Sequence, residues 1–221
     1  PEVGISNELT PDVAWTVYYH KILMTNIILD QLYTMNGTDM ERQDLAGEAY
    51  FMRAFSYFML ANLYGKPYHP ATANEDLCVP LNKEIGLSDK MMKRATNAAV
   101  YAQMEEDINK AIQCFKAIGG EKTIFRPNLP SAYLLASRIA LFQEKYDVTI
   151  LYCDSVFKVA TQPLYKLQEK KDHYFFSLAN KEILLSYGLT SLETHMKEDF
   201  RYTGNLVVSD DLLALYSEDD L

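Results

Sequence analysis

The sequence GEAYFMRAFSYFMLANLYG at residues 47–65 predicts a long helix that contacts protein on most of its sides. Alanine and aromatic residues fill this stretch, and Glu48 and Arg53 are its only formal charges, so little of its circumference suits water. Upstream, Thr38 and Glu41 have the spacing of a capping box, which predicts the start of the helix. Gly65 is expected to end it in a left-handed conformation. A helix over about residues 39–64 is therefore predicted at the centre of the fold.

Apolar residues recur at helical spacing in four further stretches. They lie at about residues 11–35, 97–118, 130–143 and 147–160. Thr10 and Pro11 are expected to begin the first of these helices, and Asn36-Gly37 forms a very short turn to the central helix. Short turns between helices produce antiparallel hairpins. The sequence thus predicts a mainly α fold of stacked, tetratricopeptide-like helical hairpins, with short extended segments and loops, and with Phe55 and Phe58 in the core.

The remaining segments have little periodicity. Residues 66–96 contain three prolines and predict a long loop of the kind that often carries function. Beyond residue 160 the signal weakens, although residues 182–187 suggest a short extended segment and Ser209 suggests the start of a helix that reaches Tyr216. We therefore expect a single domain over residues 1–221, with the helical core at about 10–160 and an irregular part at 161–221.

Composition excludes several classes of protein. The net charge of −9 and the pI near 4.9 argue against a nucleic-acid partner, because such binding requires many Lys and Arg side chains at phosphates. Cys78, Cys114 and Cys153 are too few and too scattered for a disulfide framework or a zinc site, and are expected to be small buried side chains. No apolar run is long enough to span a membrane, and a secretion signal is expected to be absent or already removed.

Charged residues give no positive support for catalysis. The run at residues 105–107 is interpreted as a solvated helix face with an ordinary Glu106–Lys110 pair. Arg53 and Arg138 lie in apolar helices and are each expected to pair with a carboxylate. The nearest approach to a metal cluster is a group of four residues whose spacing is interpreted as chance: Glu193, His195, Glu198 and Asp199. No nucleophile or phosphate-loop motif is found, so the sequence predicts no enzyme, no metal and no cofactor.

The central helix resembles a known family. Its residues Glu48-Ala49, Arg53-Ala54-Phe55, Tyr57-Phe58 and Leu63-Tyr64-Gly65 follow the pattern G-E-A-R-F-L-R-A-F-x-Y-F-x-L-x-x-x-Y-G of the SusD/RagB-like outer-membrane lipoproteins, which capture nutrient glycans. Residues 101–111 are similar to the family's Y-x-x-I-x-x-D-L-x-x-A helix, and Asn26 matches an asparagine of its first helix. Tyr50 departs from the pattern, which has arginine there.

This resemblance implies a function and a location. It implies a non-catalytic lipoprotein exposed on the outer membrane, which binds a glycan or oligosaccharide and delivers it to a TonB-dependent (SusC-like) transporter. The lipid anchor would be N-terminal and outside this chain, which would be the amino-terminal part of a longer family member. Two alternatives remain open: an intracellular helical-repeat scaffold for protein–protein interaction, and a carbohydrate-active enzyme.

The loop after the central helix is the predicted place of ligand contact. Sugars bind to flat aromatic faces with polar groups nearby. Tyr68, His69 and Asn74 offer that mixture on a segment expected to face solvent. Trp15 is the only tryptophan, and is instead expected to pack against the central helix. Two alternatives to a site in this loop also stay open: Tyr68 covers the end of that helix, or the aromatic platform lies in the rest of a longer protein.

Overall fold

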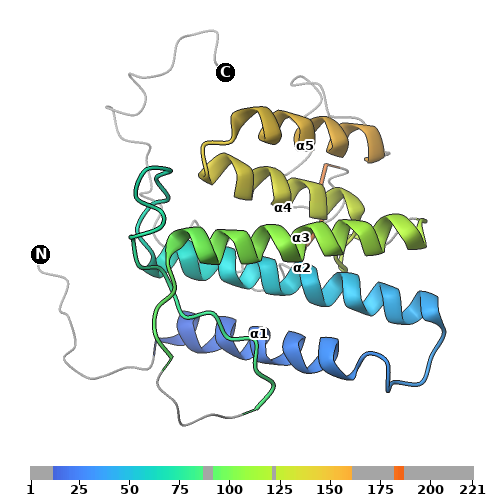
Figure 1. The fold of residues 1–221 in the computed structure, drawn as a ribbon. Coiled ribbons are helices and arrows are strands. Elements are labelled where there is room, and N and C mark those ends of the chain that lie inside the picture. The colour runs from blue at the N-terminus through green and yellow to red at the C-terminus, as the bar shows by residue number, and fades with distance from the viewer. Residues whose placement is uncertain (1–11, 87–91, 121–122, 161–181, 187–221) are drawn as a thin grey trace, which may run out of the picture. The chain divides into compact units, whose positions relative to one another are not determined.

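The computed structural model describes residues 12–86, 92–120, 123–160 and 182–186. These ranges contain five helices: α1 (Val13–Gln31), α2 (Asp39–Tyr64), α3 (Asn97–Ile118), α4 (Leu129–Phe142) and α5 (Tyr146–Val159). Each helix packs mainly against its neighbours in the chain, so the five lie side by side in chain order (Figure 1). The predicted mainly α fold of stacked helical hairpins is confirmed.

All five helices belong to one compact unit. Residues 161–181 and 187–221 lie outside the described ranges, and with them the suggested helix at 209–216 and the acidic group around His195. The single domain over residues 1–221 therefore stays a prediction. Of the suggested extended segment, residues 182–186 are described and are not in a strand.

The start of α2 matches its prediction, whereas the start of α1 does not. The Glu41 amide donates to Thr38 Oγ1 at 3.2 Å and the Thr38 amide to Glu41 Oε2 at 2.8 Å, which completes the capping box. The cap of α1 is Asp12, whose carboxylate accepts from the Trp15 amide at 3.2 Å, so Thr10 and Pro11 do not begin this helix. It also ends at Gln31, before the predicted boundary at residue 35.

Gly65 ends α2 for a different reason from the predicted one. Its φ of −87° and ψ of 164° are extended values that any residue can adopt. A Cβ at this position would lie 2.6 Å from the Ala61 carbonyl oxygen and 2.8 Å from Cys78 Sγ. The absence of a side chain therefore allows the loop to pass close to the end of the helix, and a left-handed turn is not involved.

The core lies between α2 and the helices around it. Tyr57, Phe58, Met104, Ile108 and Ile139 are among its fully buried side chains. Small residues bring α2 close to α3, since a Cβ on Gly47 would lie only 2.7 Å from the Phe115 ring. Phe58 is buried as predicted, but Phe55 is only partly buried and packs at the edge of the core. Burial of these side chains is the main source of stability for the stack.

Candidate functional site

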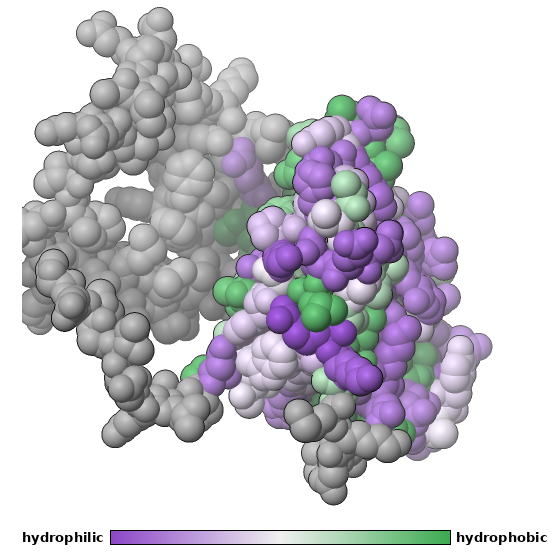
Figure 2. All heavy atoms as spheres, turned by 60° about the vertical axis from the view of Figure 1, so that its left-hand side comes forward, coloured by the Kyte–Doolittle hydropathy of each residue, from purple (hydrophilic) through white to green (hydrophobic). Residues whose placement is uncertain are grey.

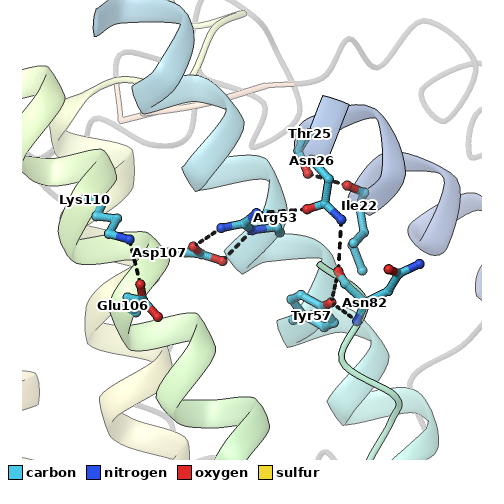
Figure 3. A network of polar contacts seen from close by, with 9 residues as sticks. All are labelled: Ile22, Thr25, Asn26, Arg53, Tyr57, Asn82, Glu106, Asp107 and Lys110. Atoms are coloured by element: carbon cyan, nitrogen blue, oxygen red, sulfur yellow. Dashed lines mark hydrogen bonds and ion pairs between the residues drawn. The ribbon is translucent and has the colours of Figure 1, made fainter. Parts of the chain in front are cut away.

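A buried polar network joins three helices at the centre of the unit (Figure 3). From α2, Arg53 donates Nε to Asp107 Oδ2 at 2.9 Å and Nη2 to Asp107 Oδ1 at 2.7 Å. Its Nη1 donates to Asn26 Oδ1 of α1 at 2.9 Å. Three residues of the motifs quoted above thus meet in one place. Because each is largely buried and satisfied by the others, this network holds the helices together and leaves no open surface for a ligand.

The same network fixes the loop that follows α2. Asn26 Nδ2 donates to the carbonyl oxygens of Asn82 at 3.0 Å and Glu84 at 3.2 Å. The Tyr57 hydroxyl donates to the Asn82 carbonyl at 3.0 Å and accepts from the Asn82 amide at 2.9 Å. Burial raises the pKa of Tyr57 to about 12. The long loop is therefore attached to the interior through its backbone at residues 82–84.

Two charged residues lie in environments other than the predicted ones. Asp107 was expected on a solvated face, but it is fully buried because it lies on the same side of α3 as Met104 and Ala111. The Glu106–Lys110 pair does lie at the surface, with 2.6 Å between Lys110 Nζ and Glu106 Oε1. Arg138 is exposed, and its guanidinium lies 5.3 Å from the centre of the Phe58 ring rather than in a buried carboxylate pair.

Reactive side chains are dispersed over the described ranges. No group of three or more His, Cys, Asp or Glu residues in those ranges is placed to hold a metal ion. The three cysteines are free, and only Cys78 is fully buried. None of the helices within these ranges combines the length and the apolar character that crossing a bilayer requires.

The predicted ligand residues lie on the loop that leaves the end of α2. Tyr68 is half-buried, with its ring centre 4.7 Å from that of Tyr101 on α3. His69 and Asn74 are exposed on a double turn, in which the His69 carbonyl accepts from the Thr72 and Ala73 amides. Trp15 packs edge-on to Tyr64 of α2 at 5.0 Å between ring centres, as predicted.

An open pocket of about 450 Å³ lies beside this turn. Its lining comes from the end of α2, from the loop that follows it and from the segment just before α3: Tyr64, Gly65, Lys66, Glu75, Asp76, Leu77 and Arg94. The surface turned forward in Figure 2, which contains the ends of α2 and α3, is mostly hydrophilic with small separate hydrophobic patches. Local sequence pattern does not predict this pocket, because its charged residues are up to 28 positions apart (66 to 94) and only the folded loop brings them together.

Charges of both signs face each other across the pocket. Lys66 Nζ lies 2.5 Å from Asp76 Oδ1, and the Thr72 hydroxyl donates to Asp76 Oδ2 at 2.5 Å. The hydrogen bond from Lys66 and then that from Thr72 lower the pKa of Asp76. With Glu75 and Arg94, the lining presents two cationic and two anionic side chains. Such a surface offers hydrogen-bond donors and acceptors side by side.

The family described as "Starch-binding associating with outer membrane" (SusD-like) matches residues 3–141. A SusD-like carbohydrate binding protein from Bacteroides vulgatus has the same fold over 78% of this chain and 36% of its own, with a TM-score of 0.67 and 22% identity. A SusD superfamily protein from Bacteroides thetaiotaomicron matches over 72% of this chain and 35% of its own, with a TM-score of 0.65 and 25% identity.

A laminarin binding SusD-like protein matches over 66% of this chain and 30% of its own, with a TM-score of 0.56 and 25% identity. The chain therefore spans about a third of the length of these solved structures. No protein with a curated description matches it.

Proposed function

Because this chain belongs to the SusD-like family of starch-binding proteins that associate with the outer membrane, we propose that it binds glycans without altering them chemically. The observation that carries the proposal is the family match over residues 3–141, which includes α1 to α3 and nearly all of α4. A structural neighbour with 25% identity is a laminarin binding protein, which supports a polysaccharide as the ligand class.

The ligand is proposed to contact the loop beside the end of α2. Tyr68 supplies an aromatic ring that is still partly accessible, and His69 and Asn74 supply polar groups on the exposed turn next to it. The neighbouring pocket adds donors and acceptors for hydroxyl groups. Aromatic surface with polar groups at its border is the combination that a sugar ring requires.

The complete protein is proposed to work at the cell surface. In this proposal an N-terminal lipid outside this chain anchors it to the outer membrane, and a TonB-dependent (SusC-like) transporter receives the glycan from it. Support comes from the family description, which names the outer membrane. Purification of the full-length lipoprotein from membranes in mild detergent tests this partnership, and repeated recovery without any transporter would contradict it.

Calorimetry tests the site, with laminarin and soluble starch as probes. We expect Tyr68→Ala and His69→Ala to weaken binding about tenfold, the equivalent of about 1.4 kcal/mol. Tyr33→Ala is the matched control, because Tyr33 is an exposed tyrosine in the turn after α1, at the other end of α2. Unchanged affinity in both loop variants would exclude this loop, and release of reducing ends from laminarin would contradict a non-catalytic role.

A further inference from the structure

The pocket beside the end of α2 has two walls that come from separate parts of the chain. One wall is the end of the helix, residues 64–66, and the other is the loop at residues 75–77. The first wall is the end of α2 and the two residues after it, whereas the second is a loop whose Leu77 forms an isolated bridge with Thr96, just before α3. The width of the pocket therefore depends on whatever connects the two walls.

Backbone contacts attach the loop wall to the start of α3. The Asn97 amide donates to the Asp76 carbonyl and the Ala98 amide to the Ala73 carbonyl, both at 2.8 Å. The Cys78 amide donates to the Ala95 carbonyl at 2.7 Å. The first two bonds satisfy amides at the helix start that have no partner within the helix. They position the loop on α3, but they do not reach the end of α2.

Arg94 makes the connection to α2. Its Nη2 donates to the Tyr64 carbonyl oxygen at the end of α2 and to the Leu77 carbonyl oxygen in the loop, both at 3.1 Å. Its Nε donates to the Cys78 carbonyl oxygen. One planar guanidinium thus joins three carbonyl oxygens from both walls, and it places a positive charge at the negative end of the α2 dipole.

The other connections between the walls are an exposed ion pair and a single hydrogen bond. Lys66 and Asp76 form an ion pair, but 69% of the Lys66 side chain is exposed, and pairs of this kind contribute little. Asn97 Nδ2 donates to the Lys66 carbonyl oxygen at 3.1 Å through a single bond. Among the described contacts, the fork of Arg94 is the one that joins three backbone positions on both walls.

We propose that Arg94 is a positioning residue for glycan binding: it sets the width of the pocket and keeps the turn at residues 69–76 in its binding orientation. This inference rests on the proposed function. A loop that is ordered before the ligand arrives avoids the entropy cost of ordering on binding, so the affinity depends on Arg94 even if its guanidinium does not touch the sugar. Lysine cannot replace it, because the three donors of an ammonium are on one nitrogen, whereas Arg94 reaches its three carbonyl oxygens from two separate nitrogens, Nε and Nη2.

The chain offers a matched control for a purely structural effect. Arg42 also joins a turn to α2, since its Nη1 donates to the carbonyl oxygens of Met35 at 3.2 Å and Gly37 at 2.7 Å. Arg42 lies in the first turn of α2, whereas the pocket is lined by Tyr64 and Gly65 at its other end. Arg42→Ala therefore removes the same kind of contact without altering the pocket.

The experiment compares Arg94→Ala, Arg94→Lys and Arg42→Ala in the full-length protein. Calorimetry with laminarin and soluble starch measures affinity, and hydrogen exchange measures the order of residues 69–78. We expect both Arg94 variants to bind about tenfold more weakly and to exchange faster in this loop, while amides of α2 and α3 stay protected. Arg42→Ala is expected to bind within about twofold of the wild type while its urea midpoint falls.

The outcomes separate this inference from the function on which it rests. Equal affinity in Arg94→Ala, or unchanged exchange at residues 69–78, would overturn the positioning role while glycan binding stands. Full affinity in Arg94→Lys would also overturn it, because a single charge would then suffice. Wild-type full-length protein that binds neither polysaccharide would refute the proposed function, and the positioning role with it.

Discussion

Arg53 carries a charge into the interior between α2 and α3, where burial without a partner would be strongly unfavourable. Asp107 offsets this cost with two hydrogen bonds, and Asn26 occupies a third donor. Tyr50 adds its ring at 5.6 Å from the guanidinium carbon and 5.3 Å from Lys110 Nζ. An aromatic residue here, where the family pattern has arginine, avoids a third cation beside Arg53 of α2 and Lys110 of α3.

Asp107→Asn is expected to destabilise the protein by about 3–5 kcal/mol, because it leaves a largely buried guanidinium without its counter-charge. Urea unfolding followed by circular dichroism measures the effect. Glu106→Gln is the control: it removes the neighbouring surface pair with Lys110 and should change stability by less than about 1 kcal/mol. Similar midpoints for the two variants would contradict the structural role of the buried pair.

The raised pKa of Tyr57 predicts how the stability of the protein changes at alkaline pH. Its pKa is raised from 10.0 to about 12 by burial, so above pH 10 the unfolded chain releases this proton before the folded chain does. Stability that is fully present below pH 10 should then fall by up to about 1.4 kcal/mol per pH unit between pH 10 and 12. Tyr57→Phe should be less stable at pH 8, because two hydrogen bonds to Asn82 are lost, but should decline less steeply above pH 10. Parallel declines would contradict this assignment.

The helical periodicity of α3 already indicates that Asp107 is buried. The pairing of Arg53 with a buried carboxylate is confirmed, but the partner was assigned to the solvated face with Glu105 and Glu106. Asp107 follows Met104 by three positions and precedes Ala111 by four, which places it on the apolar face of the helix. Arg138 is the reverse case: its neighbours in sequence suggested burial, but it lies on the exposed side of α4.

At the scale of elements, the end of α2 depends on close approach. Gly65→Ala is expected to destabilise by about 1–3 kcal/mol, because its methyl group would overlap the Ala61 carbonyl oxygen and Cys78 Sγ. Gly86→Ala is the control, since a Cβ there would meet nothing within 4 Å. Thermal unfolding of the two variants distinguishes them. A neutral Gly65→Ala would show that the loop can move away from the helix without cost.

Helices were predictable from the sequence, and the path of the loop was not. Boundaries of α2 and α3 match the prediction, because capping residues and apolar spacing are local signals. The loop after α2 is positioned by Arg94, Asn82 and the amides at the start of α3, which are contacts between distant residues. Local pattern cannot predict such contacts. The sequence pointed to Tyr68, His69 and Asn74 only through their residue types and their place on a loop. The neighbouring pocket was not predictable, because it forms through contacts between distant residues.

At the scale of the whole unit, the helices form a nearly one-dimensional array. α2 and α3 have neighbours on both sides and bury ten residues each, whereas α5 packs mainly on α4 and buries only Val156. The start of α5 also lacks a side-chain cap hydrogen bond. In arrays of this kind, terminal elements open more easily than central ones, because each element is stabilised mainly by its neighbours.

Native-state hydrogen exchange of the 221-residue chain should therefore give the lowest protection among the five helices to α5, and the highest to α2 and α3. The physical reason is the unequal burial: α5 has one fully buried side chain, Val156, beside partly buried ones such as Tyr152 and Val159, while opening α2 breaks the core and the Arg53 network together. Val156→Ala tests this order of stability: it should lower the hydrogen-exchange protection of the α5 amides and leave that of the α2 amides unchanged. If α5 amides instead exchange only with global unfolding, at the same free energy as α2, then α5 is part of one cooperative core and the description as a nearest-neighbour array is wrong.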